Sequence, residues 1–505
     1  MLNALKWATA SNIINEALVG AITLLLAIVL SPEEFGTVAL VFVLIAFVQP
    51  FLGFGFSTAL VQSQSLEQIH LNSVFWLNLG AGLLLAIIVA AGAGAWAGFF
   101  ELPDLRWMVI STSLVIPLQG ISVVQTALLQ RRMDFRALAI RTNSATAIAG
   151  IVGIMAAIQG YGAWALIAQY LVRELSSTLL VWRLSDWRPS MEFRLSAAGE
   201  LWPFAGKSLI GQFGTFVQNN ADGLVIGALL GPAPLGLYRF ADRLVEMNLK
   251  VFPRAMQAVS LSHFSRLQHD AAALNEQFLL GARLTTLVTF PALAFLAGSA
   301  TIILGAIGKQ WIDAGPALQA LAALGAVKAV LIFAGPTLQA MSRPGLVSAA
   351  VWMGVVANIV AVIVATGASS GLSDGTRIAL VAGLRTAIFS LGVSPLLLYH
   401  VTKTTALHPY SLWLSVRPAI VISAIIYLSQ SMLHWLGVWD FVGDLRIAVG
   451  LSVLVSGAVW LAYLRLADPK GWGYILRAFA ELSSVRQRAK NARFSILKPS
   501  AGDPK

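Results

Sequence analysis

Long apolar runs constrain this sequence more than any other feature. A helix that crosses the hydrocarbon core of a bilayer needs about 20 mostly apolar residues. Fourteen runs have this character, at residues 9–30, 37–60, 74–100, 107–129, 137–158, 161–183, 204–230, 234–252, 280–308, 313–341, 345–367, 376–400, 417–437 and 443–466. Only 11% of the 505 residues are charged, whereas soluble domains carry about 25%. The sequence predicts an all-α polytopic membrane protein with about fourteen transmembrane helices.

Basic residues predict the orientation of these spans. They cluster after spans four, six, eight and twelve and behind span fourteen, whereas the alternate loops hold only Arg106, Lys309, Arg377 and Arg446. Because positively charged loops stay in the cytoplasm, we expect both termini to be cytoplasmic. The net charge of +11 therefore reflects topology, and we expect no nucleic-acid partner.

The eighth span carries a stripe of five charges: Arg239, Asp242, Arg243, Glu246 and Lys250. At about 100° per residue they fall within an arc of about 100° on the helix. A charge at the centre of a membrane helix costs about 2.5–3.5 kcal/mol, so this face must avoid lipid. It must lie against protein or line a water-filled cavity.

Two explanations of the stripe remain open. The first is internal pairing, because Glu246 precedes Lys250 by four residues and Arg239 precedes Asp242 by three, which are favourable helical spacings. Arg243 would then share Glu246 with Lys250. The second, which we favour, is a cavity wall that contacts a polar or anionic ligand.

Further polar residues lie within the first twelve spans. They are Glu16, Asn219, Asn220, Asp222, Arg173, Glu174, Lys328 and Arg385. Together with the stripe they comprise six basic and five acidic groups, which is close to neutral, so each can be a ligand contact or one half of a structural pair. Asp222 and Glu16 are candidates for an ion-coupling site, because a carboxyl group deprived of water binds a proton more readily.

Signatures of enzymes, metals and cofactors are missing from the sequence. There are no cysteines, and the six histidines form no metal-spaced pair on a helix. The segment FAGKS at residues 204–208 ends like a phosphate-binding loop, but Leu201 stands where that motif needs glycine. We therefore expect no catalytic residue, no metal site and no cofactor.

An internal repeat relates the first six spans to the next six. Pro32 and Gly36 recur as Pro232 and Gly236, an offset of 200 in both cases, and Gln130 is echoed by Gln339. The offset covers an even number of spans, so both halves insert in the same direction, related by an axis along the membrane normal. We expect a first lobe at 1–184, a linker at 185–203, a second lobe at 204–401, two additional spans at 402–467 and a basic tail at 468–505.

Several of these segments resemble the polysaccharide transporter family, which includes the Wzx-type flippases and the colanic-acid exporters. They are SPEEFG, GFGFSTALVQ, LLQRRMDFRALAIR, GYGAWALIAQYLVRE and NNADGLVIGALLGPAPLGLYRFADRL. The resemblance covers spans one to twelve. It implies two six-helix lobes around a V-shaped cavity in the bacterial inner membrane. It also implies alternating access that moves an undecaprenyl-diphosphate-linked oligosaccharide, with polysaccharide polymerase and assembly proteins as partners besides membrane lipids.

The same resemblance implies that basic cavity residues contact the diphosphate. Here these would be Arg239, Arg243 and Lys250, with Arg173 and Arg385; the neighbouring Asp242 and Glu246 depart from a simply cationic cavity. A multidrug or cation exporter of the same superfamily is the alternative, with Glu16 and Asp222 as its acidic pocket. A membrane polymerase or glycosyltransferase, and a scaffold of the assembly complex, are further alternatives.

The absence of native cysteines allows a direct test of the topology. A single cysteine in place of Asp134 should react with a membrane-impermeant thiol reagent only from the cytoplasmic side, and one in place of Asp374 only from outside, because their loops differ in charge. Labelling of intact cells and of inverted vesicles measures this. The reverse pattern would overturn the assignment.

Overall fold

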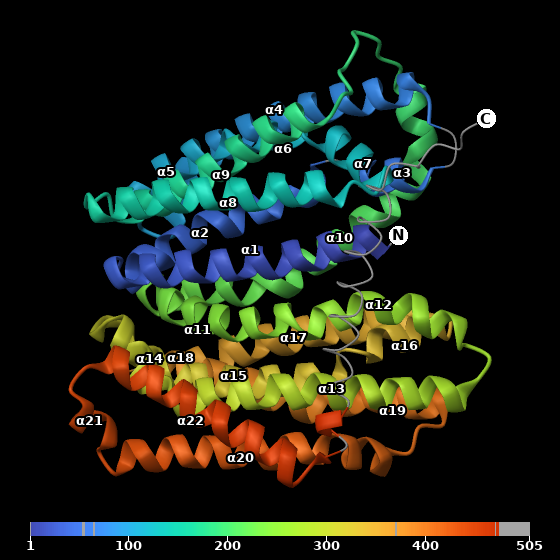
Figure 1. The fold of residues 1–505 in the computed structure, drawn as a ribbon. Helices are drawn as coiled ribbons and strands as arrows, with labels where there is room; N and C mark the ends of the chain where they lie inside the picture. The colour runs from blue at the N-terminus through green and yellow to red at the C-terminus, as the bar shows by residue number, and fades with distance from the viewer. Residues whose placement is uncertain (1, 53–55, 64–65, 369–370, 470, 474–505) are drawn as a thin grey trace, which may run out of the picture.

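The computed structural model describes residues 2–52, 56–63, 66–368, 371–469 and 471–473, which form helices and no strands. This confirms the predicted all-α class. Most of the predicted basic tail, 474–505, lies outside the described residues. Figure 1 shows the helices in two groups, one above the other.

The upper group in Figure 1 contains the first nine helices. They are α1 (Leu2–Val29), α2 (Pro32–Val48), α3 (Phe56–Gln62), α4 (Gln68–Phe99), α5 (Pro103–Ser113), α6 (Val115–Gly120), α7 (Val123–Arg131), α8 (Phe135–Ile158) and α9 (Ala163–Leu184), with the 3-10 turn η1 (Gln49–Phe51) after α2. We call these helices the first lobe.

The second lobe comprises α10 to α19. Its helices are α10 (Leu195–Leu230), α11 (Pro232–Val251), α12 (Pro253–Arg266), α13 (Ala271–Gly298), α14 (Ala300–Ile307), α15 (Gly315–Leu331), α16 (Ala334–Ala340), α17 (Pro344–Ala368), α18 (Asp374–Ile388) and α19 (Ser394–Thr405), with the short turns η2 (Lys309–Ala314) and η3 (Phe389–Val393). Helices α20 (Pro409–Trp435), α21 (Val438–Val442) and α22 (Leu445–Leu466) follow.

Among the described residues, ten helices are long and apolar enough to cross a membrane, or eleven if the bent pair α5–α6 and α7 is one span. The number fourteen therefore stays a prediction. Helices α9, α10 and α11 coincide with the other predicted spans, and charged or polar residues such as Arg173, Asn219 and the stripe lower their hydropathy. Helix α10 begins at Leu195 rather than near 204, so it takes up much of the predicted linker.

The two Pro–Gly turns of the repeat meet where α2 crosses α11. A Cβ atom on Gly36 would lie 1.7 Å from the carbonyl oxygen of Pro232, and a Cβ on Gly236 would lie 1.7 Å from that of Pro32. Contacts that are equal in both directions are what a two-fold axis between the helices requires. Only glycine permits so close a backbone approach at both positions.

The N-termini of α2 and α11 at this crossing are capped in different ways. Ser31 caps α2, and its side chain and that of Glu34 satisfy each other's backbone N–H groups in a capping box. Gly231 is the N-cap residue before α11 and has φ of +88°, a conformation that residues with a side chain disfavour. The second match of the repeat, Gln130 with Gln339, is also seen in the backbone. Met133 and Ser342 each follow one of these glutamines by three residues, and both have a positive φ, +55° and +58°.

Trp311 of η2 also ties the lobes together at this crossing. Its side chain is fully buried, and its Nε1 donates a 2.7 Å hydrogen bond to the carbonyl oxygen of Ala27 in α1. Its ring packs on Phe240 with centroids 4.3 Å apart and on Phe35 at 5.2 Å. The lobes are therefore closely packed at the end where α2 and α11 begin.

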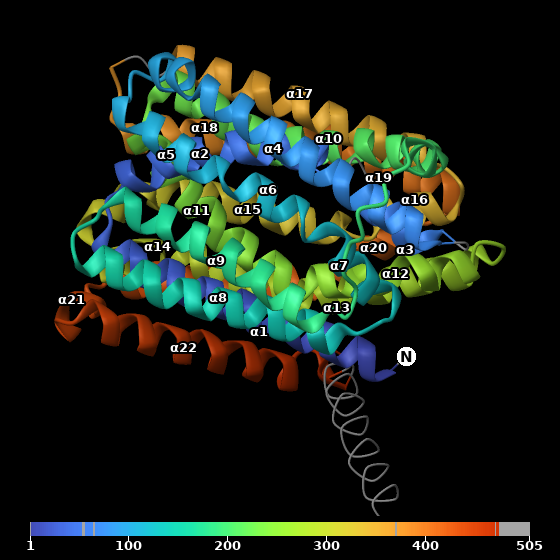
Figure 2. The ribbon, with the colours of Figure 1, turned by 90° about the horizontal axis from the view of Figure 1, so that it is seen from above.

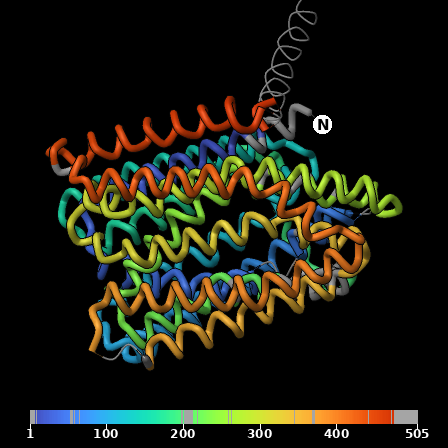
Figure 3. The backbone as a smooth tube through the Cα atoms, turned by 90° about the horizontal axis from the view of Figure 1, so that it is seen from below, coloured from blue at the N-terminus to red at the C-terminus, as the bar shows by residue number. Residues whose placement is uncertain are grey.

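The last two long helices lie outside the repeat. Helix α20 packs along α13, and a buried polar network in which Gln430 bonds Ser452 and Ser456 joins it to α22. Figures 2 and 3 show α22 along one edge of the molecule and α17 along the opposite edge. The division into two lobes and two additional spans stays a prediction.

The glycine crossing can be tested by adding one methyl group. We expect Gly36→Ala and Gly236→Ala each to lower the melting temperature of the purified protein, because overpacking of this kind costs about 1–3 kcal/mol. The double variant should cost less than the sum, because both methyl groups force apart the same two backbones.

Gly80→Ala is the matched control, since a Cβ there meets nothing within 4 Å. That helical substitution should be neutral or stabilising. Equal melting temperatures for all three single variants, measured by thermal unfolding in detergent, would contradict the close approach of α2 and α11.

Candidate functional site

A cavity of about 640 Å³ lies between the two lobes. Helices α1, α2 and α9 of the first lobe face α10, α11, α12, α15, α17 and α18 of the second across it. The ten residues predicted from the sequence to contact a ligand all lie in its wall: Arg173, Asn219, Asn220, Arg239, Asp242, Arg243, Glu246, Lys250, Lys328 and Arg385. Their role in binding stays a prediction.

Basic side chains outnumber acidic ones in the wall of the cavity. Among the described residues that line the cavity, seven side chains are basic and two, Asp242 and Glu246, are acidic. The sequence suggested a near balance because it counted Glu16, Glu174 and Asp222, which do not line the cavity. These three carboxylates pair with basic groups of the wall, so the wall and its partners together hold seven basic and five acidic groups, a modest positive excess.

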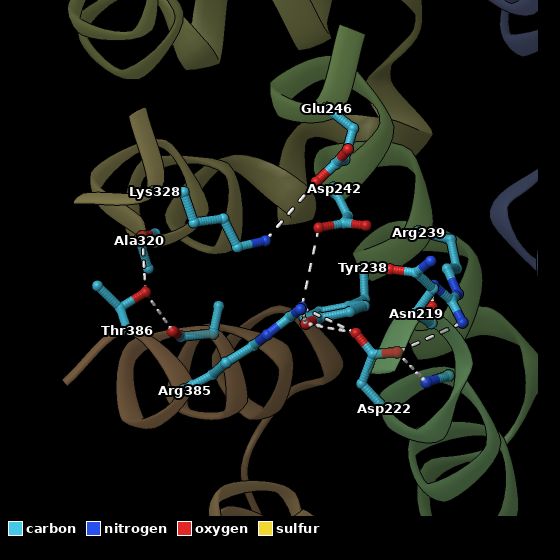
Figure 4. Close-up of polar contacts among 12 residues, drawn as sticks. Asn219, Asp222, Tyr238, Arg239, Asp242, Glu246, Ala320, Lys328, Arg385 and Thr386 are labelled. Atoms are coloured by element: carbon cyan, nitrogen blue, oxygen red, sulfur yellow. Dashed lines mark hydrogen bonds and ion pairs between the residues drawn. The ribbon is translucent and has the colours of Figure 1, made fainter. Parts of the chain in front are cut away.

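Asp222 of α10 is the centre of a cluster of polar contacts beside the cavity (Figure 4). Its side chain is 2% exposed, and Arg385 of α18 donates a 2.8 Å hydrogen bond to it. Arg239 lies 3.5 Å away, and the Tyr238 hydroxyl and the Gly223 N–H donate further hydrogen bonds. Asp222 thus holds two arginines in place, and these donors occupy the carboxylate that an ion-coupling role would need.

Arg385 also connects Asp222 to the stripe. It donates to the Tyr238 hydroxyl and lies 3.8 Å from Asp242, and Figure 4 shows it reaching across from α18 toward α10 and α11. Arg239 lies directly over Gly223, where a Cβ would come within 2.0 Å of its guanidinium. Ion pairs therefore connect helices α10, α11 and α18 at the closed end of the cavity.

Glu16 of α1 faces the stripe from the first lobe. Its carboxylate lies 3.9 Å from Arg243 and 4.0 Å from Lys250, distances at which charges attract without a good hydrogen bond. The oxygen nearest Arg243 is buried and has no hydrogen-bond partner. Arg243 and Lys250 therefore keep donors that a ligand can use.

Glu246 pairs in the opposite direction, within the second lobe. Arg254 of α12 donates a 2.7 Å hydrogen bond to it, and Lys328 of α15 lies 3.6 Å away. Internal pairing along the stripe, with Glu246–Lys250 and Arg239–Asp242 as pairs, was wrong: in the described part of the chain every ion pair of these five residues reaches another helix.

Arg254 is the charged wall residue that the sequence analysis missed. We counted it among the basic loop residues that follow the eighth span, but it lies in α12, whose first residue is Pro253, a position that proline favours. Arg254 follows Lys250 by four residues, so its spacing in the stripe was the signal that could have found it. Its side chain is 49% exposed, against 13% for Arg385, so the cavity opens toward the end of α11.

The first lobe supplies a different kind of surface. Its contribution is mainly aromatic and aliphatic, with Phe35, Phe42 and Tyr170 among the lining residues. Arg173 is its basic member; it lies over the Tyr170 ring at 5.1 Å and pairs with Glu174 at 2.7 Å. A cationic wall therefore faces an aromatic one, and the aromatic wall could not be predicted because its residues are typical of any membrane helix.

The fold is shared with solved transporters. The chain is similar to the lipid II flippase MurJ in an inward closed conformation, with a TM-score of 0.66, 14% identity, and 91% of this chain and 96% of that chain covered. It is also similar to an inward-facing multidrug resistance MATE family transporter of the MOP superfamily, with a TM-score of 0.60, 14% identity, and 78% and 95% covered. The protein is a multi-pass membrane protein with this transporter fold.

A family model described as polysaccharide biosynthesis protein matches residues 25–316, more than half of the chain. The chain belongs to that family. It is 31% identical to the succinoglycan biosynthesis transport protein ExoT of Rhizobium meliloti over 59% of this chain and 60% of that protein. It is 22% identical to the lipopolysaccharide biosynthesis protein WzxC of Escherichia coli over 63% and 66%. The matches thus span about 60% of the length of these relatives.

The role of Asp222 can be tested through stability. Asp222→Asn should lower the melting temperature strongly, because removal of one partner from a buried ion pair costs about 3–5 kcal/mol, and Arg385 would stay buried beside it. Asp186→Asn is the control, since its pair with Arg132 is exposed and such pairs contribute about 0–1 kcal/mol. Equal effects of the two substitutions on thermal unfolding would contradict a structural role for Asp222.

Proposed function

We propose that this protein is a flippase that moves undecaprenyl-diphosphate-linked oligosaccharide repeat units across the bacterial inner membrane, for lipopolysaccharide or exopolysaccharide biosynthesis. Transport would proceed by alternating access, with both termini in the cytoplasm and the lobes at 1–184 and 204–401 rocking against each other so that the cavity opens to one side at a time. The ligand is a lipid-linked sugar in the membrane, and a polysaccharide polymerase and assembly proteins are expected partners.

The observation that carries this proposal is the cationic wall between the lobes. A diphosphate and a sugar chain cannot cross hydrocarbon without partners for their charges and hydroxyl groups. Arg239, Arg243 and Lys250 line the cavity, and arginine grips phosphate with two parallel hydrogen bonds. The facing aromatic wall suits the apolar faces of sugar rings, since ligand sites combine such surfaces with a few polar groups.

The closed and open ends of the cavity fit one step of such a cycle. The lobes are tightly packed where Gly36 meets Gly236, and exposure of the wall increases toward Arg254. With the topology predicted from the loops, the open end faces the cytoplasm, where the lipid-linked cargo would enter. Release on the other side would require the crossing to open while the Glu16 contacts close.

The alternative, a multidrug or cation exporter, is supported by the fold it shares with MATE transporters. Such an exporter would need a free acidic pocket to bind a cation. Glu16 and Asp222 are instead surrounded by arginine and lysine, so the positive wall favours an anionic cargo. The relatives are described as transport and biosynthesis proteins, and we propose that this chain is a carrier rather than an enzyme.

Deletion of the gene in the parent bacterium tests the proposal most directly. We expect loss of one surface polysaccharide and accumulation of its undecaprenyl-diphosphate-linked repeat unit on the inner leaflet, because the cargo can no longer cross. Mass spectrometry of extracted lipids identifies the intermediate. Normal polymer with no accumulated intermediate, together with increased drug sensitivity, would instead support the exporter.

Arg243 tests whether the wall contacts cargo. Arg243→Ala should abolish polymer export at a normal protein level, because Glu16 retains Lys250 as a partner. Arg243→Lys should restore part of the export, because lysine keeps the charge but loses the planar fork that binds phosphate. Export is measured as surface polymer, with Arg446→Ala, an exposed arginine of α22, as the control.

A purely structural role for Arg243 makes a different forecast. If Arg243 serves only to neutralise Glu16, the double variant Arg243→Ala with Glu16→Gln should recover both protein level and export. We expect no recovery of export. Full recovery would exclude direct contact between Arg243 and the cargo.

A further inference from the structure

An apolar groove of about 1090 Å³ lies beside the cavity, between α2, α4, α10 and α17. Its described lining residues carry no charge, and they include Leu44, Phe51, Ile88 and Leu229. Helices α2 and α4 come from the first lobe, and α10 and α17 from the second. The groove therefore bridges the lobes on a face that is distinct from the charged wall.

The groove and the cavity share two helices. On α2, Val43 lines the cavity and Leu44 the groove; on α10, Asn220 lines the cavity and Leu224 the groove. Asn220 and Leu224 are about one helical turn apart on nearly the same face of α10, so the cavity and the groove adjoin along this helix. A molecule with a charged head and an apolar tail could occupy both spaces by passing between α2 and α10.

Four phenylalanines close the seam between these helices. Phe47 of α2 packs on Phe213 and Phe216 of α10, with ring centroids 6.1 and 5.5 Å apart, and Phe51 of η1 packs on Phe213 at 6.3 Å. Contacts between aromatic rings add modestly to the free energy of packing, and the rings involve no hydrogen bond that must be replaced when they separate. Separation of the rings leaves no buried polar group unpaired, so the seam can open at lower cost than one held by charges.

The groove also has the length of a membrane lipid chain. From Leu85 to Phe99 along α4 the rise is about 21 Å at 1.5 Å per residue, roughly two thirds of the hydrocarbon core. Figures 2 and 3 show α22 on the opposite edge of the molecule from α17, and no residue of α20 or α22 is among the described residues that line the groove.

We propose that this groove holds the polyprenyl tail of the lipid whose diphosphate and sugars occupy the cavity, and that the α2–α10 seam is where the two parts of that lipid are joined. The inference rests on the proposed function, which makes the cargo lipid-linked. An isoprenoid chain stays out of water in the groove, while the covalently attached diphosphate reaches the basic wall.

Two glycines of α4 provide a matched pair of variants. A Cβ on Gly92 or on Gly94 meets nothing within 4 Å, but only Gly92 lines the groove; two residues apart on a helix, they point to nearly opposite faces. Gly92→Phe should fill the groove without disturbing the helix packing, and Gly94→Phe should place the same ring elsewhere.

The probe is a polyprenyl diphosphate with a photoreactive group near the end of its chain, added to the purified full-length protein in nanodiscs. We expect the label on peptides of α4 and α10. Undecaprenyl phosphate should compete with the probe, and phosphatidylglycerol should not. The Gly92→Phe protein should lose most of the labelling, and the Gly94→Phe protein should keep it. Export in cells should follow the same order.

Competition by phosphatidylglycerol to the same extent would show a site for bulk membrane lipid only and would overturn the inference, as would label on α20 and α22 instead. Normal export by a Gly92→Phe protein that no longer takes up label would also overturn it. The proposed function itself is tested separately in the deletion strain. If no lipid-linked intermediate accumulates there, the proposed function is wrong, whatever the labelling of the groove shows.

Discussion

Charge at membrane depth is the constraint on which this structure depends. Helix α11 carries five charged residues within a span that should cross the bilayer, and exposure of even one of them to lipid costs several kcal/mol. The two lobes remove that cost by enclosing α11 between them, so that each charge finds a partner helix or a cavity. The cavity therefore follows from the need to place these residues.

The ion pairs of these charged residues differ in how close they are, and this difference bears on function. At the closed end Asp222 holds Arg385 through a hydrogen bond at 2.8 Å, with a carboxylate that is almost fully buried. Nearer the open end Glu16 lies about 4 Å from Arg243 and Lys250 and forms no hydrogen bond with them. The first set fixes helices of the second lobe to one another, whereas the second set links the two lobes loosely and leaves donors available for a ligand.

The crossing of α2 and α11 provides the complementary rigid element. Backbone meets backbone at Gly36 and Gly236 with no side chain between them, and Trp311 packs beside the crossing. Packed interfaces of this kind prefer discrete arrangements to continuous deformation. In a rocking cycle of the two lobes, the crossing would part as a unit at one end while the polar contacts of Glu16 hold the lobes together at the other.

The sequence by itself determined the class of fold, the stripe and the related turns, because these depend on local hydropathy, on helical periodicity and on spacing along the chain. It also identified residues that line one cavity, since any polar group in a membrane helix must avoid lipid. Only the tertiary structure decided the pairing: Glu16 with Arg243, Asp222 with Arg385, and Glu246 with Arg254 and Lys328. Ion pairs form between atoms within about 4 Å, and the first two of these join residues more than 150 positions apart in the chain. The excess of basic groups in the wall was decided in the same way, because the six predicted basic residues and Arg254 all line the cavity while Glu16, Glu174 and Asp222 pair with them from beside it.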